Sequence, residues 1–256
     1  MFLSALGLSG ALGVDWRTAV AQIVYTVLGV YLALVLHEIA HGLVALWNGD
    51  PTAKNMGRLS MNPLKHFDLI GLIMMLAIGF GYAKPVPVNP YNFKKYRTGL
   101  FTVAIAGICM NIILAFFSVL LFYLFGLGYY NYAGTTGGDV FFYISGFFSY
   151  FAQLNVALAF FNLLPIFPLD GFRIIESFTH QGNKYCRFMR NNGQYILWGL
   201  VGLSFIVSTA LNYAPVDLYW IRYFDVLGLY IDTCSYGVLW VFNAFWGLMF
   251  PFGGAI

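Results

Sequence analysis

Apolar residues in this chain form long, nearly uninterrupted runs, and polar residues gather between them. Runs of about 20 apolar residues can cross the hydrocarbon of a bilayer as α-helices, which satisfy their own backbone hydrogen bonds. Such runs cover residues 18–46, 99–125, 141–164 and 195–211, and one or two shorter ones lie between residues 220 and 250. The pattern predicts an all-α, polytopic membrane helix bundle of about five to six spans.

The segment between the first two long runs has a different pattern. Residues 48–97 contain Asn-Gly and Asn-Pro turn signals, and the apolar stretch 69–82 is interrupted by glycines. That stretch is too short and too rich in glycine for a span. We expect a small re-entrant element there, followed by extended, β-like backbone from Lys84 through Pro85 and Val86 to Val88.

Composition supports a membrane protein. Hydrophobic residues make up 60% of the chain and charged residues only 9%, against roughly 25% charged residues in soluble domains. The net charge of +3 indicates no nucleic-acid partner. Residues 1–14 lack the basic start of a secretory signal, so we expect a lead-in that is not cleaved. We interpret residues 1–256 as one integral-membrane domain, with a core at about 18–173 and further spans at about 194–253.

Basic residues are distributed unevenly and predict an orientation. Eleven of the 13 lysines and arginines lie within residues 48–97 and 170–190. The loops around 131–139 and 212–232 contain only Arg222 among basic residues. Because basic loops stay in the cytoplasm, the 48–97 region and the loop that carries Asp170 are both predicted to be cytoplasmic.

The first predicted span contains the sequence His37-Glu38-Ile39-Ala40-His41, an HExxH motif. Residues four apart share one face of a helix, so both imidazoles can bind one Zn²⁺, and the glutamate between them can accept a proton from water. Burying three ionisable groups inside a span costs on the order of several kcal/mol, which favours a functional site over a structural one.

A catalytic zinc needs a third protein ligand and an open position for water. Asp170 follows a helix break at Pro165 and Pro168, and Gly171 permits a tight turn that aims the carboxylate into the bundle. Alone, Asp170 would be a solvated loop residue. With HExxH at a similar predicted depth, we expect one Zn²⁺ per chain bound by His37, His41 and Asp170.

Asn111 lies in the middle of another apolar run. A buried amide is costly unless it is hydrogen-bonded. One interpretation is that it stabilises the oxyanion of a tetrahedral intermediate, and the other is a hydrogen bond between helices.

Five motifs in a fixed order resemble the site-2 protease family in a minimal form without PDZ or CBS domains. They are HEIAH at 37–41, NPLKHFD at 62–68, GYAKPVPV at 81–88, AGICMN at 106–111 and PLDG at 168–171. The resemblance implies that His37, His41 and Asp170 bind zinc, that Glu38 is the catalytic base and that Asn111 lies beside the active site.

That resemblance also implies a reaction. The chain would be a zinc-dependent endopeptidase that hydrolyses a peptide bond within or near a transmembrane segment of a protein substrate, in a bilayer that we expect to be a bacterial plasma membrane. A substrate helix must unwind locally before it is cleaved. The unwound strand could be held by β-augmentation, in which it pairs with the backbone of Lys84, Pro85 and Val86. The alternative is a non-proteolytic metal-binding membrane protein or a transporter. A transporter would need further polar groups along its path, whereas Glu38 is the only charged residue deep inside a predicted span.

Overall fold

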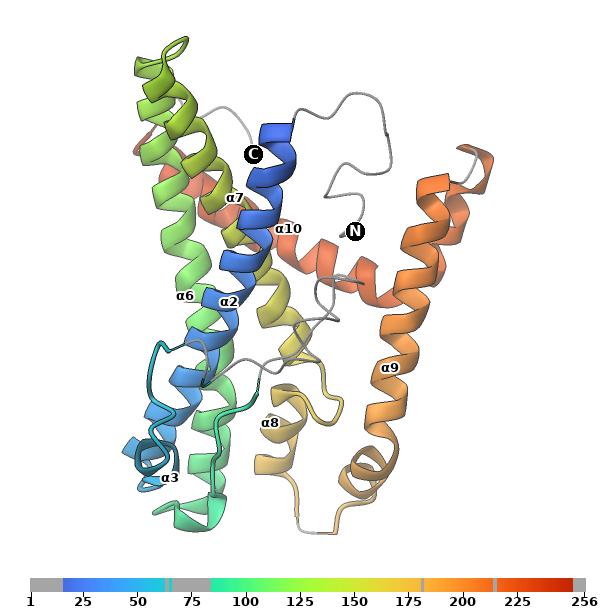
Figure 1. Cartoon of the computed structure of the whole chain (residues 1–256). Helices are drawn as coiled ribbons and strands as arrows, with labels where there is room; N and C mark the ends of the chain where they lie inside the picture. Colours follow the sequence, from blue (N-terminus) through green and yellow to red (C-terminus); the bar gives the residue numbers. More distant parts are fainter. Residues whose placement is uncertain (1–15, 63–64, 66–83, 181, 214–215, 251–256) are drawn as a thin grey trace.

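A computed structural model describes residues 16–62, 65, 84–180, 182–213 and 216–250. Within these residues every regular element is a helix and none is a strand (Figure 1). The elements in chain order are α2 (Trp16–Trp47), α3 (Thr52–Asn55), η1 (Pro90–Asn92), α6 (Tyr96–Asn131), α7 (Thr136–Leu163), α8 (Asp170–Phe178), α9 (Lys184–Tyr213), η2 (Val216–Phe224) and α10 (Val226–Gly247).

Four of these helices are long and apolar enough to cross a membrane: α2, α6, α7 and residues Lys184–Leu211 of α9. They coincide with the four long apolar runs, so the helical part of the prediction is confirmed. α9 begins at Lys184, before its predicted start at 195. The apolar run missed the first turns of this helix because they carry the basic residues Lys184, Arg187 and Arg190. α10 crosses the other helices obliquely in Figure 1 and is not among the four. A count of five to six spans therefore stays a prediction.

The predicted re-entrant element at 69–82 and the lead-in at 1–14 lie outside the described residues. Residues 84–88, for which β-like backbone was predicted, are irregular and pair with no strand in the part of the chain that the structure describes. The strand character of this segment stays a prediction.

α6 is the central helix of the bundle, since it contacts α2, α7, α8 and α10. Val119 and Tyr123 of α6 pack with Ala152 of α7 in a buried cluster, and residues of α10, including Trp246, cover that cluster. The indole Nε1 of Trp246 donates to the carbonyl of Phe116, 3.0 Å away. α9 stands to one side and contacts η2 and α10, and Leu197 joins it to the loop after α7.

The loop between α7 and α8 is fixed by local chemistry. Pro165 disfavours a helical conformation at Leu164, which has φ −56° and ψ 134° and ends α7. A Cβ added at Gly171 would lie 2.1 Å from the carbonyl oxygen of Leu163 and 2.4 Å from that of Leu164. Only glycine permits this approach, so the first turn of α8 packs directly on the end of α7. Asp170 is thereby placed beside the bundle.

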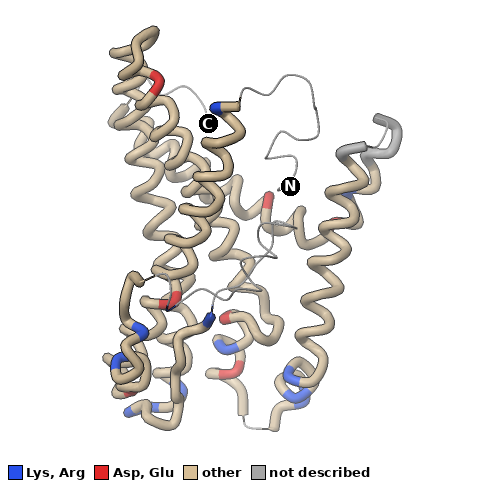
Figure 2. The backbone as a smooth tube through the Cα atoms, in the orientation of Figure 1, with Lys and Arg blue, Asp and Glu red and all other residues tan. Residues whose placement is uncertain are grey.

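Most of the basic residues gather at one end of the molecule. In Figure 2 most lysines and arginines cluster at the lower end of the view, around α3 and the starts of α6 and α9. This is the arrangement expected of a helix bundle whose two ends face different sides of a membrane.

Candidate metal centre

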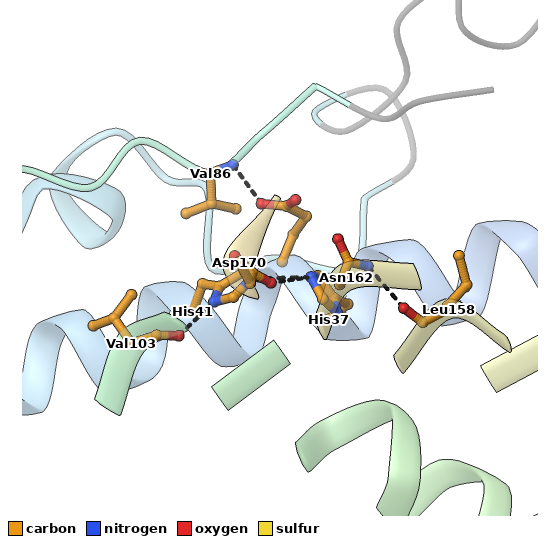
Figure 3. A network of polar contacts seen from close by, with 8 residues as sticks. His37, His41, Val86, Val103, Leu158, Asn162 and Asp170 are labelled. Carbon is orange, nitrogen blue, oxygen red and sulfur yellow. Dashed lines mark hydrogen bonds and ion pairs between the residues drawn. The ribbon is translucent and has the colours of Figure 1, made fainter. Parts of the chain in front are cut away.

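His37, His41 and Asp170 form a compact triangle of ligand atoms (Figure 3). The Nε2 atoms of the two histidines are 3.0 Å apart. Oδ2 of Asp170 lies 3.2 Å from Nε2 of His37 and 3.1 Å from Nε2 of His41. All three residues are buried, with exposed fractions of 5%, 5% and 6%. The structure therefore brings together the three residues that the sequence predicted as ligands.

The triangle fits a zinc ion. Zinc is usually tetrahedral, and bonds of about 2.0–2.1 Å to nitrogen and oxygen place neighbouring ligand atoms about 3.3 Å apart. The three observed separations are close to that edge length. Two imidazoles and one carboxylate are ligand types that zinc accepts, and three protein ligands leave the fourth position for water or substrate, as in catalytic sites.

Contacts behind the ligands fix their chemical state. Nδ1 of His41 lies 2.6 Å from the carbonyl oxygen of Val103 on α6. A carbonyl can only accept, so Nδ1 carries a proton and Nε2 is the nitrogen left to face a metal. Burial alone would raise the pKa of Asp170, but the imidazoles of His41 and His37 hold that pKa well below its ordinary value. The carboxylate is therefore ionised.

Gly107 of α6 allows the helix to approach the two histidines. A Cβ added there would lie 2.5 Å from Cε1 of His37, and 2.6 Å from Nε2 of both His37 and His41. Sequence reasoning quoted this glycine within a motif but gave it no role. The sequence signal for this role was a small residue one helical turn before Asn111.

Glu38, the residue after His37 on α2, accepts a hydrogen bond from the backbone N–H of Val86, at 2.7 Å. Its carboxylate is thus held next to the segment that the sequence predicted to bind substrate. The Lys84 and Pro85 side chains are exposed, whereas Val86 is buried. The carbonyl oxygens of Lys84 and Pro85 accept hydrogen bonds from the Nη2 group of Arg58. Sequence reasoning had assigned no role to Arg58.

Asn111 is fully buried in α6. Neither its amide nitrogen nor its amide oxygen has a hydrogen-bond partner among the described residues. Among the residues that the structure describes, Asn111 therefore has no interhelical hydrogen bond. Its position one turn after Gly107 places it on the face of α6 that meets the histidines.

Comparisons with known proteins agree with this geometry. The model of peptidase family M50 matches residues 130–207. The chain is 40% identical over 194 residues to a Bacillus subtilis protein named "Putative zinc metalloprotease YwhC", an alignment that covers 69% of this chain and 85% of that protein. The chain belongs to peptidase family M50. A second relative, the Mycolicibacterium smegmatis protein "Putative zinc metalloprotease Rip2", is 29% identical over 217 residues, covering 82% of this chain and 76% of that protein. No solved structure matches the M50 chain.

Membership of family M50 confirms the resemblance to site-2 proteases. This M50 protein is a zinc metalloendopeptidase, and zinc is its cofactor. Together with its four long apolar helices, the family makes it a multi-pass membrane protein. The roles of the individual residues remain predictions, which the site geometry makes specific.

Proposed function

We propose that this M50 protein is an intramembrane endopeptidase that cleaves a transmembrane protein substrate within or near its membrane-spanning segment. The location of the cluster supports this proposal most directly. Both histidines and Glu38 lie on α2, one of the four candidate membrane-spanning helices. An enzyme whose ligands lie on such a helix acts on bonds that reach it within the membrane or at its surface.

His37, His41 and Asp170 would hold the zinc. Bound zinc lowers the pKa of a water molecule towards about 7 and polarises a carbonyl group. Glu38 takes a proton from the attacking water and returns it to the leaving amine. The Asn111 amide, which is buried without a partner among the described residues, donates to the oxygen that becomes negative as the carbonyl is attacked.

The substrate segment has to unwind before it is cleaved, because a helix shields its peptide bonds with internal hydrogen bonds. The Lys84–Val88 segment lies next to Glu38 through the Val86 contact, and Lys84 and Pro85 of this segment are exposed. Since the Val86 N–H already donates to Glu38, an incoming strand would pair with other backbone groups of this segment.

The active site would face the cytoplasmic side of a bacterial plasma membrane. Most basic residues gather at one end of the molecule (Figure 2), and such residues are retained in the cytoplasm. Bacillus subtilis and Mycolicibacterium smegmatis, the sources of the two relatives, are both bacteria.

The test compares purified wild type with Glu38→Gln. Glu38 is assigned as a base and not as a ligand, so the variant should keep one zinc per chain and lose cleavage of a model transmembrane substrate by about 10²- to 10⁴-fold. Glu176→Gln is the matched control, since Glu176 lies on α8 and pairs with Arg190. Cleavage by Glu38→Gln at the rate of wild type would refute the mechanism.

A further inference from the structure

The peptide group between Pro85 and Val86 is held from both sides. On one side Nη2 of Arg58 donates to the carbonyl oxygen of Pro85, at 3.1 Å, and also to that of Lys84, at 2.8 Å. On the other side the N–H of the same peptide group donates to Glu38 at 2.7 Å. A trans peptide is planar, and its C=O and N–H point in opposite directions. A cation and a carboxylate therefore bind the two ends of one rigid unit.

The chain on either side of this peptide group is stiff. Proline fixes φ at Pro85, and Pro87 restricts Val86 to extended backbone. Neither proline has an N–H that could compete for Glu38. The orientation of the peptide plane then depends on the groups that bind its two ends, and Arg58 is the one that binds its oxygen.

Arg58 is placed to hold this peptide group against α2. Arg58 is 9% exposed. The next residue, Leu59, approaches Gly42 of α2 so closely that an added Cβ would lie 2.5 Å from Leu59 Cδ2, and the same Cβ would lie 3.0 Å from Val86 Cγ1. Leu59 and Val86 thus pack side by side on the helix, one residue beyond His41. A buried guanidinium whose Nη2 group donates to two backbone carbonyls stabilises this arrangement.

The far end of the segment has its own anchor. Asp50, which is fully buried, accepts hydrogen bonds from the Asn89 N–H at 2.7 Å and from the Asn92 side chain at 2.8 Å. Asp50 follows the end of α2, so the segment is fastened at both ends to parts of the chain that flank the HExxH helix. Only the Arg58 end adjoins the peptide group that contacts Glu38.

We propose that Arg58 is a positioning residue for catalysis: through the Pro85–Val86 peptide group it sets the orientation of the Glu38 carboxylate. This inference rests on the proposed role of Glu38 as base. Without Arg58 the peptide plane can rotate, its N–H leaves Glu38, and the carboxylate takes other rotamers. The metal ligands do not depend on Arg58, so zinc binding is retained.

The first test observes the contact itself. Protein labelled with ¹³C at proline carbonyls and ¹⁵N at valine gives carbonyl-to-amide correlations from three Pro-Val bonds in the sequence, those ending at Val86, Val88 and Val216. Arg58→Ala should shift the Val86 amide in the same direction as Glu38→Gln does, and leave Val216 in place. A Val86 resonance that moves no more than that of Val216 in Arg58→Ala would overturn the proposal.

The second test measures turnover of a model transmembrane substrate. A misplacement of about 1 Å costs on the order of 10²-fold, so Arg58→Ala should lower kcat by about 10- to 100-fold, with KM and zinc content close to wild type. Arg58→Lys, which retains a donor and a charge, should recover part of that loss. Arg97→Ala removes an exposed arginine at the start of α6 and is the control.

The outcomes separate the two proposals. If wild type cleaves and Glu38→Gln does not, an Arg58→Ala variant with wild-type kcat refutes the positioning role alone. Loss of zinc in Arg58→Ala also refutes it, since the residue would then support the metal site. If Glu38→Gln cleaves as wild type does, the proposed function itself has failed.

Discussion

A methyl group added at Gly107 tests the metal centre most directly. The new Cβ of Gly107→Ala would lie 2.5–2.6 Å from three atoms of the His37 and His41 rings. Carbon atoms in contact prefer separations of about 3.5–4.0 Å, so the rings or the helix must move by about 1 Å. α6 cannot simply retreat, because the Val103 carbonyl on the same helix holds His41 Nδ1 at 2.6 Å.

A displacement of this size exceeds what a zinc site tolerates, since ligand distances hold to within about 0.2 Å. We expect Gly107→Ala to bind zinc much more weakly and to cleave at least about 10²-fold more slowly. Helix propensity alone predicts a more stable protein with unchanged zinc affinity, because alanine stabilises a helix interior by about 1 kcal/mol relative to glycine. Zinc affinity and melting temperature together therefore separate the two explanations.

The assay is zinc affinity, measured by competition with a chelator, together with the melting temperature. Gly126→Ala is the matched control on the same helix, because its Cβ would meet only Ser145 Oγ at an ordinary 3.8 Å. We expect the control to keep wild-type affinity. Zinc affinity of Gly107→Ala within about twofold of the control would refute the packing argument.

Four further predictions concern the ligand Asp170, Asn111, the buried Asp50 and the orientation of the chain in the membrane. Asp170→Ala should lose zinc. Asn111→Ala should keep zinc and should melt no lower than wild type, because no hydrogen bond is removed. Its turnover should be about 10²-fold slower. Burial alone would raise the pKa of Asp50, but hydrogen bonds from Thr52, Asn92 and Asn89 hold that pKa below its ordinary value. The stabilisation from Asp50 is therefore complete above the ordinary pKa of an aspartate and is lost as the pH falls through the lower folded-state pKa, so the melting temperatures of Asp50→Asn and wild type should converge in acid. Cysteine substitutions at Lys184 and Asn131 should be labelled from opposite sides of the membrane, Lys184 from the cytoplasm.

Periodicity was the part of the sequence that predicted structure well. A long apolar run leaves few choices in a bilayer, and residues at i and i+4 on a helix must share a face. The four long helices and the proximity of His37 to His41 therefore followed from the sequence. Asp170 could also be found, because prolines before it and glycine after it mark a turn at the end of a span.

The contacts made by irregular backbone could not be predicted in the same way. The Val86 N–H reaches Glu38, 48 positions earlier, and no repeating pattern connects a proline-rich segment to a particular point on a helix. The role of Gly107 was hidden for a related reason. A glycine in an apolar run indicates close packing without naming the partner, and here the partner is an imidazole pair from another helix.

The groups that support this site are mostly main-chain atoms. They are the Val103 carbonyl behind His41, the Val86 N–H that donates to Glu38, and the Lys84 and Pro85 carbonyls that accept from Arg58. Alanine scanning leaves every one of them in place, because it removes only atoms beyond Cβ. A mutational map of residues 84–103 would therefore understate how much of the catalytic apparatus they supply. Amide-to-ester exchange, which deletes a single N–H or weakens a single carbonyl, is the kind of chemistry that would reveal it.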